Sequence, residues 1–399
     1  MRNLSFWLLL ILVFVIPWEN AVTFEGLGTI SRFLGLFLFV AWFTCTLFSC
    51  RVRRPHLFHV FVGAFVLWNA AGLFWSVDPD ATIKRAMTFI QLGMLTFIIW
   101  DLNRTAPAIR SVLQAYIFGA CVSVGSIIYN FLLNQEVGFG RFAAAGFDPN
   151  DIGVIIAIGI PLAWYLAFVQ PGRHRALAWL NYAYIPLAVF GVLLTASRDA
   201  SLALIPSIFF MLWSLRKLDL SRRVAVITAL LCSAWLIYSI VPAYSLERLA
   251  STTNEVTQGN LNSRTLIWEA GLRVYHDSPL WGAGGGAYPY VVQPVLGREV
   301  VAHNSFLSVL VECGIIGLCL FLGVLLSALR SANRHDLMQR AMWLAVIAVI
   351  VLGASALTWE YRKPLWLFMT LVVASSSILL SENREESGME QHMLEGGVS

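Results

Sequence analysis

The chain has 399 residues, of which 58% are hydrophobic and only 13% are charged, whereas soluble globular proteins carry about 25% charged residues. This composition excludes an ordinary soluble domain and predicts an all-α polytopic membrane protein. The formal net charge of only +4 does not indicate a basic surface for nucleic-acid binding, so nucleic acid is not expected among the partners.

Apolar runs predict about twelve membrane helices, because a helix needs about 20 apolar residues to cross a bilayer. The first run follows a short basic start, and since it lacks a convincing cleavage site we interpret it as an uncleaved membrane helix. The runs lie near residues 4–18, 28–49, 57–76, 85–101, 108–133, 151–169, 177–196, 200–215, 223–242, 304–328, 340–358 and 363–380. Nine helices therefore occupy 1–242 and three occupy 304–381, with a long connection over 243–303 and a tail over 382–399.

The basic residues of the connections predict the orientation. One alternate set of connections, which includes 51–56, 101–110, 216–223 and 330–340, is clearly richer in Lys and Arg than the other. The positive-inside rule places this set, both termini and the tail in the cytoplasm. The long connection then lies on the outer face.

The 243–303 connection is long enough to be functional. Within it, 262–279 predicts an amphipathic interfacial helix, with Asn262 and Ser263 as possible caps. Its apolar residues recur at roughly helical spacing, at Leu266, Trp268, Leu272 and Tyr275. The glycine-rich "WGAGGGAYPY" follows at 281–290. It is either a flexible connector or, through the backbone N–H groups of Gly284 and Gly285, a place where an anion can approach.

Three outer-face residues make a chemical suggestion as a set. Arg198 lies between the seventh and eighth predicted helices, Arg264 begins the loop helix and His303 precedes the tenth helix. Each has an ordinary explanation: Arg198 can pair with Asp199, Arg264 can be a solvated helix start, and His303 can be interfacial packing. Two guanidinium groups suit a diphosphate leaving group, and a histidine suits a general base.

Acidic residues offer further candidates. Asp78 and Asp80 in "SVDPD" could hold a divalent cation, although Asp-Pro-Asp is also good turn chemistry. In "FDPND", Asp148, Asn150 and Asp151 fit a helix start and could also line an acceptor pocket. Glu312 falls on the face of its helix opposite His303, so it is read as a structural partner for a buried polar group, or as protonated.

Several segments resemble one family of bacterial membrane proteins. "TASRDA", "NSRTLIWEAGLRVYHDSPLWGAGGGAY" and "AHNSFLSVLVECGIIGL", in this order, resemble the O-antigen ligase and polymerase superfamily over roughly residues 190–320. "FDPNDIGVIIAIGIPLAWYL" at 147–166 adds to the resemblance, whereas the first 130 residues match only as a series of helices.

The resemblance implies an inverting glycosyltransferase of a bacterial inner membrane, with its site on the periplasmic side and with no metal ion and no cofactor. The donor would be an undecaprenyl-diphosphate-linked glycan. Arg198 and Arg264 would bind the diphosphate, His303 would activate the acceptor hydroxyl and Asn304 would support it.

The superfamily contains two main activities, and the sequence is compatible with both. A ligase moves the glycan to lipid A–core, whereas a polymerase joins repeat units on the lipid carrier. The single long outer loop favours the ligase, because polymerases often carry two such loops. A lipid-linked glycan transporter, a metal-dependent transferase built on Asp78 and Asp80, and a non-catalytic assembly subunit are the competing classes. Transporters usually show paired repeats, and the two halves of this chain show no obvious repeat.

Overall fold

The computed structural model describes residues 2–26, 28–49, 52–169, 175–250 and 264–396. Within them the protein is an all-α bundle, with one two-stranded hairpin of β1 (Thr23–Phe24) and β2 (Gly28–Thr29). Twelve helices are long and apolar enough to cross a membrane, and each covers one of the twelve predicted runs. The all-α polytopic prediction is confirmed. The possible caps Asn262 and Ser263 lie outside the described residues.

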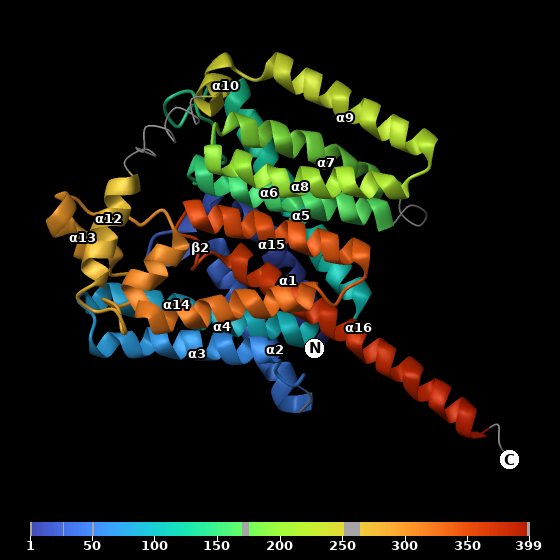
Figure 1. Cartoon of the computed structure of the whole chain (residues 1–399), viewed down its shortest axis with the longest axis horizontal. Helices are drawn as coiled ribbons and strands as arrows, with labels where there is room; N and C mark the ends of the chain where they lie inside the picture. The colour runs from blue at the N-terminus through green and yellow to red at the C-terminus, as the bar shows by residue number, and fades with distance from the viewer. Residues whose placement is uncertain (1, 27, 50–51, 170–174, 251–263, 397–399) are drawn as a thin grey trace.

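The helices run side by side along one direction (Figure 1). Nine precede the long connection: α1 (Arg2–Val15), α2 (Ile30–Ser49), α3 (Leu57–Ala71), α4 (Pro79–Leu102), α5 (Ala106–Leu132), α6 (Pro149–Val169), α7 (Arg175–Leu194), α8 (Arg198–Ser214) and α9 (Leu220–Ile240). Three follow it: α14 (Ser305–Ala332), α15 (Leu337–Ala356) and α16 (Lys363–Gly396). Short 3₁₀ turns extend α1, α3 and α8 at Ile16–Ala21, Gly72–Phe74 and Leu215–Lys217.

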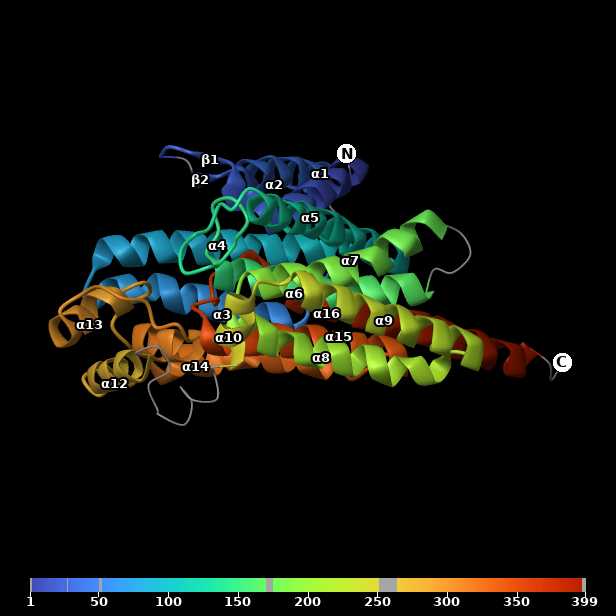
Figure 2. The same ribbon diagram turned by 90° about the horizontal axis from the view of Figure 1, so that it is seen from above.

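The bundle has a buried centre and exposed edges. The α6 helix is the most completely buried span and packs against α5, α7, α8 and α15. By contrast α9 has no buried residue and α2 has only Ser31 and Leu38 buried, so both lie at the edge (Figures 1 and 2). Apolar side chains exposed on such edges match a lipid environment.

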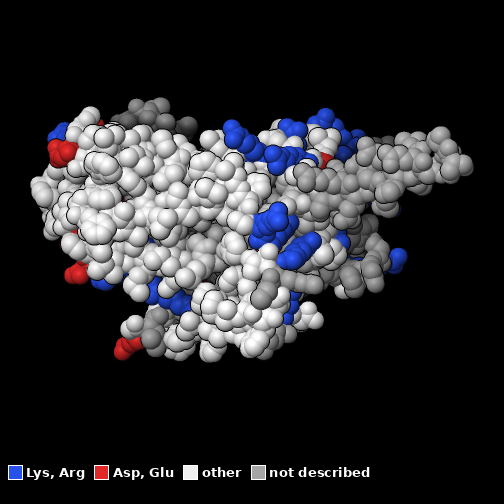
Figure 3. Space-filling model, turned by 90° about the horizontal axis from the view of Figure 1, so that it is seen from below, with Lys and Arg blue, Asp and Glu red and all other residues white. Residues whose placement is uncertain are grey.

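The two ends of the bundle differ in charge. We call the end that carries α12 (Arg264–Tyr275) and α13 (Tyr288–Leu296) the loop face. Most of the Lys and Arg visible in Figure 3 lie over the half of the molecule away from these two helices. At that opposite end the Arg2 guanidinium donates to both the carbonyl and the carboxylate of Asp101. The backbone N–H of Arg53 donates to the same carboxylate.

Among the described residues of the long connection there are three short helices, where the sequence predicted one. The predicted loop helix is α12, but its buried residues are Ile267, Ala270 and Gly271, whereas the predicted apolar positions Leu266 and Leu272 are exposed. The other two helices, α10 (Ala243–Ala250) and α13, were not predicted. Pro289 at the start of α13 and the left-handed Gly297 after its end are the signals that could have revealed it.

A break in α14 fixes the loop face to the bundle. Gly314 interrupts the helix with φ 67° and ψ −173°. The segment before α13 fits into this break: Ala283 N–H donates to the Val311 carbonyl at 2.9 Å, and Ile315 N–H donates to the Pro279 carbonyl at 2.9 Å. Because backbone groups inside a membrane protein must be hydrogen-bonded, this insertion makes the break possible.

We predict that Gly314→Ala destabilises the protein by about 1–3 kcal/mol, because a Cβ would demand an unfavourable left-handed backbone. That Cβ would also lie 2.2 Å from the Leu280 carbonyl oxygen. The measurement is the melting temperature of the purified protein in detergent. Gly125→Ala is the matched control, since a Cβ there meets open space. An unchanged melting temperature for Gly314→Ala would show that the break is dispensable.

Candidate functional site

Polar residues from four helix starts gather at the loop face. Asp148 and Asn150 stand at the start of α6, Arg198 at the start of α8 and Arg264 at the start of α12, while His303 precedes α14. The charges of Arg264, Asp148, Asp199 and Asp151 all influence the protonation of His303, so these groups lie near one another. Helix N-termini carry partial positive charge, which favours an anion at their meeting point.

The two predicted arginines are held by neighbouring groups. Arg264 makes a two-point ion pair with Asp199, with N···O distances of 3.2 and 2.7 Å. Arg198, the residue before Asp199, donates from Nε to the Arg248 carbonyl at 3.1 Å. Asp199 therefore joins Arg264 to the start of α8, which brings the two predicted diphosphate ligands into one neighbourhood.

His303 is fixed through its backbone. Its φ of 48° is left-handed, and its N–H donates to the Thr358 hydroxyl at 3.1 Å. Asn304 caps α14, since its Oδ1 accepts from Phe306 N and Leu307 N at 3.0 Å each. Asn304 thus holds the chain that carries His303.

The surroundings of His303 keep it neutral. Burial, and after it the positive charge of Arg264, lower the pKa of His303 below its usual value of 6.5. Asp148, Asp199 and Asp151 act in the opposite direction but do not outweigh burial. A neutral imidazole can accept a proton, which is the state that a general base requires.

Asp151 links the site to the connection between α15 and α16. Its carboxylate accepts a hydrogen bond from Trp359 Nε1 at 2.9 Å and forms an ion pair with Arg362. Trp359 and Arg362 were missed from the sequence, because the partners lie more than 200 residues apart. The "WEYRK" segment at 359–363 gave only the signal of charges between two apolar runs.

Asp148 and Asn150 are tied to the start of α6. Asp148 Oδ1 accepts from Asn150 N at 2.8 Å, and Asn150 Oδ1 accepts from Arg141 Nη2 at 2.7 Å. Burial, and next the charge of Arg248, lower the pKa of Arg141. Arg141 is therefore a third guanidinium close to the predicted pair. No motif in the sequence singled it out.

The glycine turn is used for packing, which corrects one prediction. Gly284 N–H donates to the Glu312 carbonyl at 2.9 Å, so it is not available to a bound anion in this conformation. A Cβ on Gly285 would lie 3.0 Å from Asn69 Oδ1. Glu312 accepts from the N–H of Gly286 at 2.7 Å, so it serves a buried polar group as the sequence suggested.

The second acidic pair forms a helix cap. Asp78 Oδ1 accepts from Ala81 N at 2.8 Å as the N-cap of α4, and Asp80 lies in the first turn of that helix. Among the residues that the structure describes, no group of three or more His, Cys, Asp or Glu is placed to hold a metal ion.

Comparisons with known proteins agree with the resemblance seen in the sequence. Residues 183–322 match the model of the O-antigen ligase family. This range contains Arg198, Arg264 and His303. The chain is 23% identical over 298 residues to the exopolysaccharide production protein ExoQ of Rhizobium meliloti (strain 1021). The match covers 70% of this chain and 66% of that relative, just under two thirds of its length.

We predict that the imidazole of His303 titrates below pH 6.5, because burial and Arg264 disfavour its charged form. The measurement is a pH titration by NMR of histidine-labelled protein, with the His303 signal assigned by its loss in His303→Asn. Arg264→Gln is expected to raise the midpoint, and Arg273→Gln on the same helix is the control. A midpoint at or above 6.5 would contradict the proposed environment.

Proposed function

We propose, from its membership of the O-antigen ligase and polymerase superfamily, that this protein transfers a glycan from an undecaprenyl diphosphate to an acceptor hydroxyl. The gathering of Arg198, Arg264 and a neutral His303 at one face of a membrane bundle carries the proposal. Since Lys and Arg concentrate toward the opposite end, the loop face would be periplasmic and both termini cytoplasmic, in an inner membrane.

In the proposed reaction the acceptor oxygen attacks the anomeric carbon of the donor sugar. A new C–O bond forms as the bond from that carbon to the diphosphate oxygen breaks, which inverts the configuration. His303 takes the hydroxyl proton, and the diphosphate leaves with the bonding electron pair. Arg198 and Arg264 would stabilise the charge that develops on it.

Asp199 would aim Arg264 at the diphosphate. A guanidinium carries more N–H donors than a two-point pair with one carboxylate uses, so Arg264 can bind Asp199 and a phosphate oxygen together. Arg141 adds positive charge beside Asn150. Lysine could not make the same planar contacts.

The acceptor is the finer part of the proposal. Lipid A–core, as for a ligase in lipopolysaccharide assembly, is what the single long loop favours. A lipid-linked acceptor, as for an exopolysaccharide polymerase, is favoured by the name of the relative. The residue roles are the same for both, because each acceptor presents a sugar hydroxyl.

We predict that His303→Asn lowers glycan transfer by about 10²-fold, because the general base is lost. Asparagine tolerates the left-handed backbone of this position, so the fold is retained. The assay gives purified protein an undecaprenyl-diphosphate-linked glycan with EDTA present, and offers lipid A–core or a lipid-linked acceptor. His276→Asn, an exposed histidine of the same loop, is the control. Full transfer by His303→Asn would refute the base.

The same assay tests the metal-free mechanism and the assignment of the protein as a ligase. Activity that disappears with EDTA and returns with a divalent cation would refute the metal-free mechanism. Longer chains on the lipid carrier, without a lipid A–core product, would make the protein a polymerase.

We also predict that Arg264→Gln lowers transfer by about 10- to 100-fold, because a charge-assisted contact to the leaving diphosphate is removed. Arg264→Lys should restore only a small part of the activity, since an ammonium cannot bind two oxygens in one plane. Arg273→Gln, an exposed arginine of α12, should retain activity. If Arg264→Gln kept wild-type activity, the diphosphate role would be wrong.

A further inference from the structure

An apolar groove opens between α2 and α4. Six of its lining residues are Leu12, Leu36, Phe39, Leu92, Met94 and Ile98. Its volume is about 300 Å³. Because α2 is largely exposed on the edge of the bundle, the groove can be reached sideways from the lipid. We refer to it as the α2–α4 groove.

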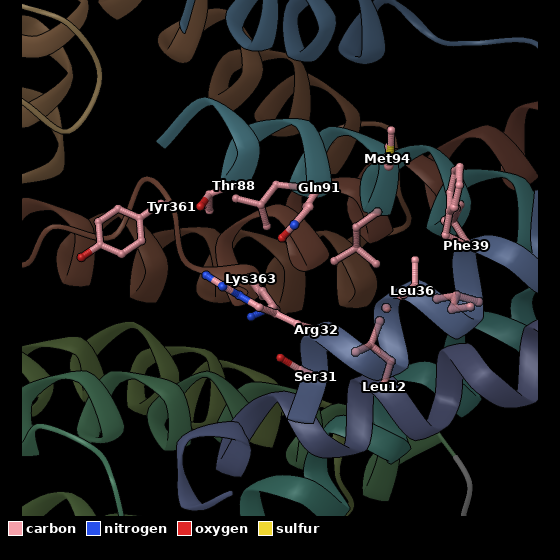
Figure 4. Close-up of a pocket in the computed structure, with 15 residues that line it drawn as sticks. Leu12, Ser31, Arg32, Leu36, Phe39, Thr88, Gln91, Met94, Tyr361 and Lys363 are labelled. Atoms are coloured by element: carbon pink, nitrogen blue, oxygen red, sulfur yellow. The ribbon is translucent and has the colours of Figure 1, made fainter. Parts of the chain in front are cut away.

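Charged side chains close the groove at one end. In Figure 4 the nitrogen atoms of Arg32 and Lys363 lie toward Tyr361, whereas Phe39 and Met94 lie toward the other end. Arg32 and Lys363 begin α2 and α16, so this charged end faces the loop face. An apolar channel with cations at the membrane boundary is complementary to a single lipid chain with an anionic head.

A second, larger cavity continues from the charged end. It has a volume of about 480 Å³ and shares Arg32, Thr88, Tyr361 and Lys363 with the groove. Its charged lining residues are Arg32, Lys84, Arg85, Arg362, Lys363 and Glu19. We refer to it as the basic cavity.

Two of these cations have no carboxylate partner within the described part of the chain. Lys363 pairs with Glu19 at 2.7 Å, Arg85 pairs with Glu360 at 3.0 Å, and Arg362 pairs with Asp151. No described carboxylate lies within ion-pair distance of Arg32 or Lys84, and both are exposed. The basic cavity thus keeps uncompensated positive charge next to an apolar groove, which is the pattern expected for a diphosphate with a lipid chain.

The basic cavity is connected to His303 through one ion pair. Arg362 lines the cavity and pairs with Asp151, whose charge acts on His303. The groove lies at α2, and Arg198 begins α8; these two helices occupy opposite sides of the bundle in Figure 2. The structure therefore has two separate groups of cations, one near α2 and one near the start of α8.

We propose that the α2–α4 groove and the basic cavity bind a second isoprenoid-diphosphate-linked glycan, which serves as the acceptor. The isoprenoid chain would lie in the groove, the diphosphate on Arg32, Lys84 and Lys363, and the first sugar toward Arg362 and His303. This inference rests on the proposed function and names its acceptor class. An isoprenoid places a single chain in the one groove, whereas a phospholipid carries two chains.

Gly35 allows a direct test. It lines the groove, and a Cβ at this position meets no atom within 4 Å, so Gly35→Leu fills the groove without a backbone clash. Gly125→Leu is the matched control, because Gly125 is also a helical glycine at which an added Cβ meets no atom within 4 Å. It lies on an exposed side of α5. Arg32→Gln tests the charged end.

The experiment labels the full chain, in lipid nanodiscs, with a benzophenone-bearing farnesyl diphosphate and maps the labelled peptides. We expect label on α2 and α4, reduced about tenfold by Gly35→Leu and by Arg32→Gln but unchanged by Gly125→Leu. Excess phosphatidylglycerol should not displace it. Label on α2 and α4 that survives Gly35→Leu, or that phosphatidylglycerol displaces as well as unlabelled farnesyl diphosphate does, would overturn the proposal.

His303→Asn separates this inference from the proposed function. It should lower transfer about 10²-fold while α2 and α4 are still labelled, because His303 is not among the residues that line the groove. If His303→Asn kept wild-type transfer, the role of His303 as the base would be refuted, and the labelling result would still test the groove. With wild-type protein, Gly35→Leu should stop elongation on a lipid-linked acceptor. Normal elongation by Gly35→Leu would also overturn the proposal.

Discussion

The interrupted α14 is the constraint on which the loop face depends. A left-handed Gly314 opens the helix, and the segment ending in Ala283 and Gly284 supplies hydrogen bonds to the exposed backbone of Val311 and Glu312. Trp68 of α3 adds a bond from Nε1 to the Cys313 carbonyl at 2.8 Å. The long connection is thereby held against the bundle, and α12 acquires a fixed place from which Arg264 reaches Asp199. Non-helical backbone at membrane depth is stable only where such partners exist.

The site uses paired charges to keep polar groups at a membrane boundary. Asp199 compensates Arg264 and Asp151 compensates Arg362. Glu360, in the same connection as Arg362, is deeply buried, and desolvation raises its pKa to about 7 against the opposing charge of Arg85. Such pairs position the cations without removing all their charge, since a guanidinium can bind a second anion. In the proposed reaction, cations held in this way would already be oriented toward the diphosphate, which would limit reorganisation during transfer.

The sequence predicts the spans better than the contacts between them. Twelve apolar runs become twelve helices, because length and hydropathy alone decide whether a segment can cross a bilayer. The short α13 escapes prediction although Pro289 and Gly297 mark its ends, and the β1–β2 hairpin escapes it because each strand has only two residues. Arg198, Arg264 and His303 could be selected from local motifs, but Asp151 and Arg362 are separated by 211 positions and only the folded chain joins them. Gly284 was selected as an anion contact because a glycine-rich turn is equally suited to bind an anion or to pack closely.

The number of long loops is therefore a weak guide to the acceptor. The single loop favoured a ligase because polymerases often carry two such loops. Yet a lipid-linked substrate arrives through the membrane, and its chain requires a groove between helices rather than a loop. The α2–α4 groove with the basic cavity is such a groove, and Arg362 and Asp151 connect the cavity to His303. If a lipid-linked acceptor binds there, chain growth on the carrier becomes the natural outcome.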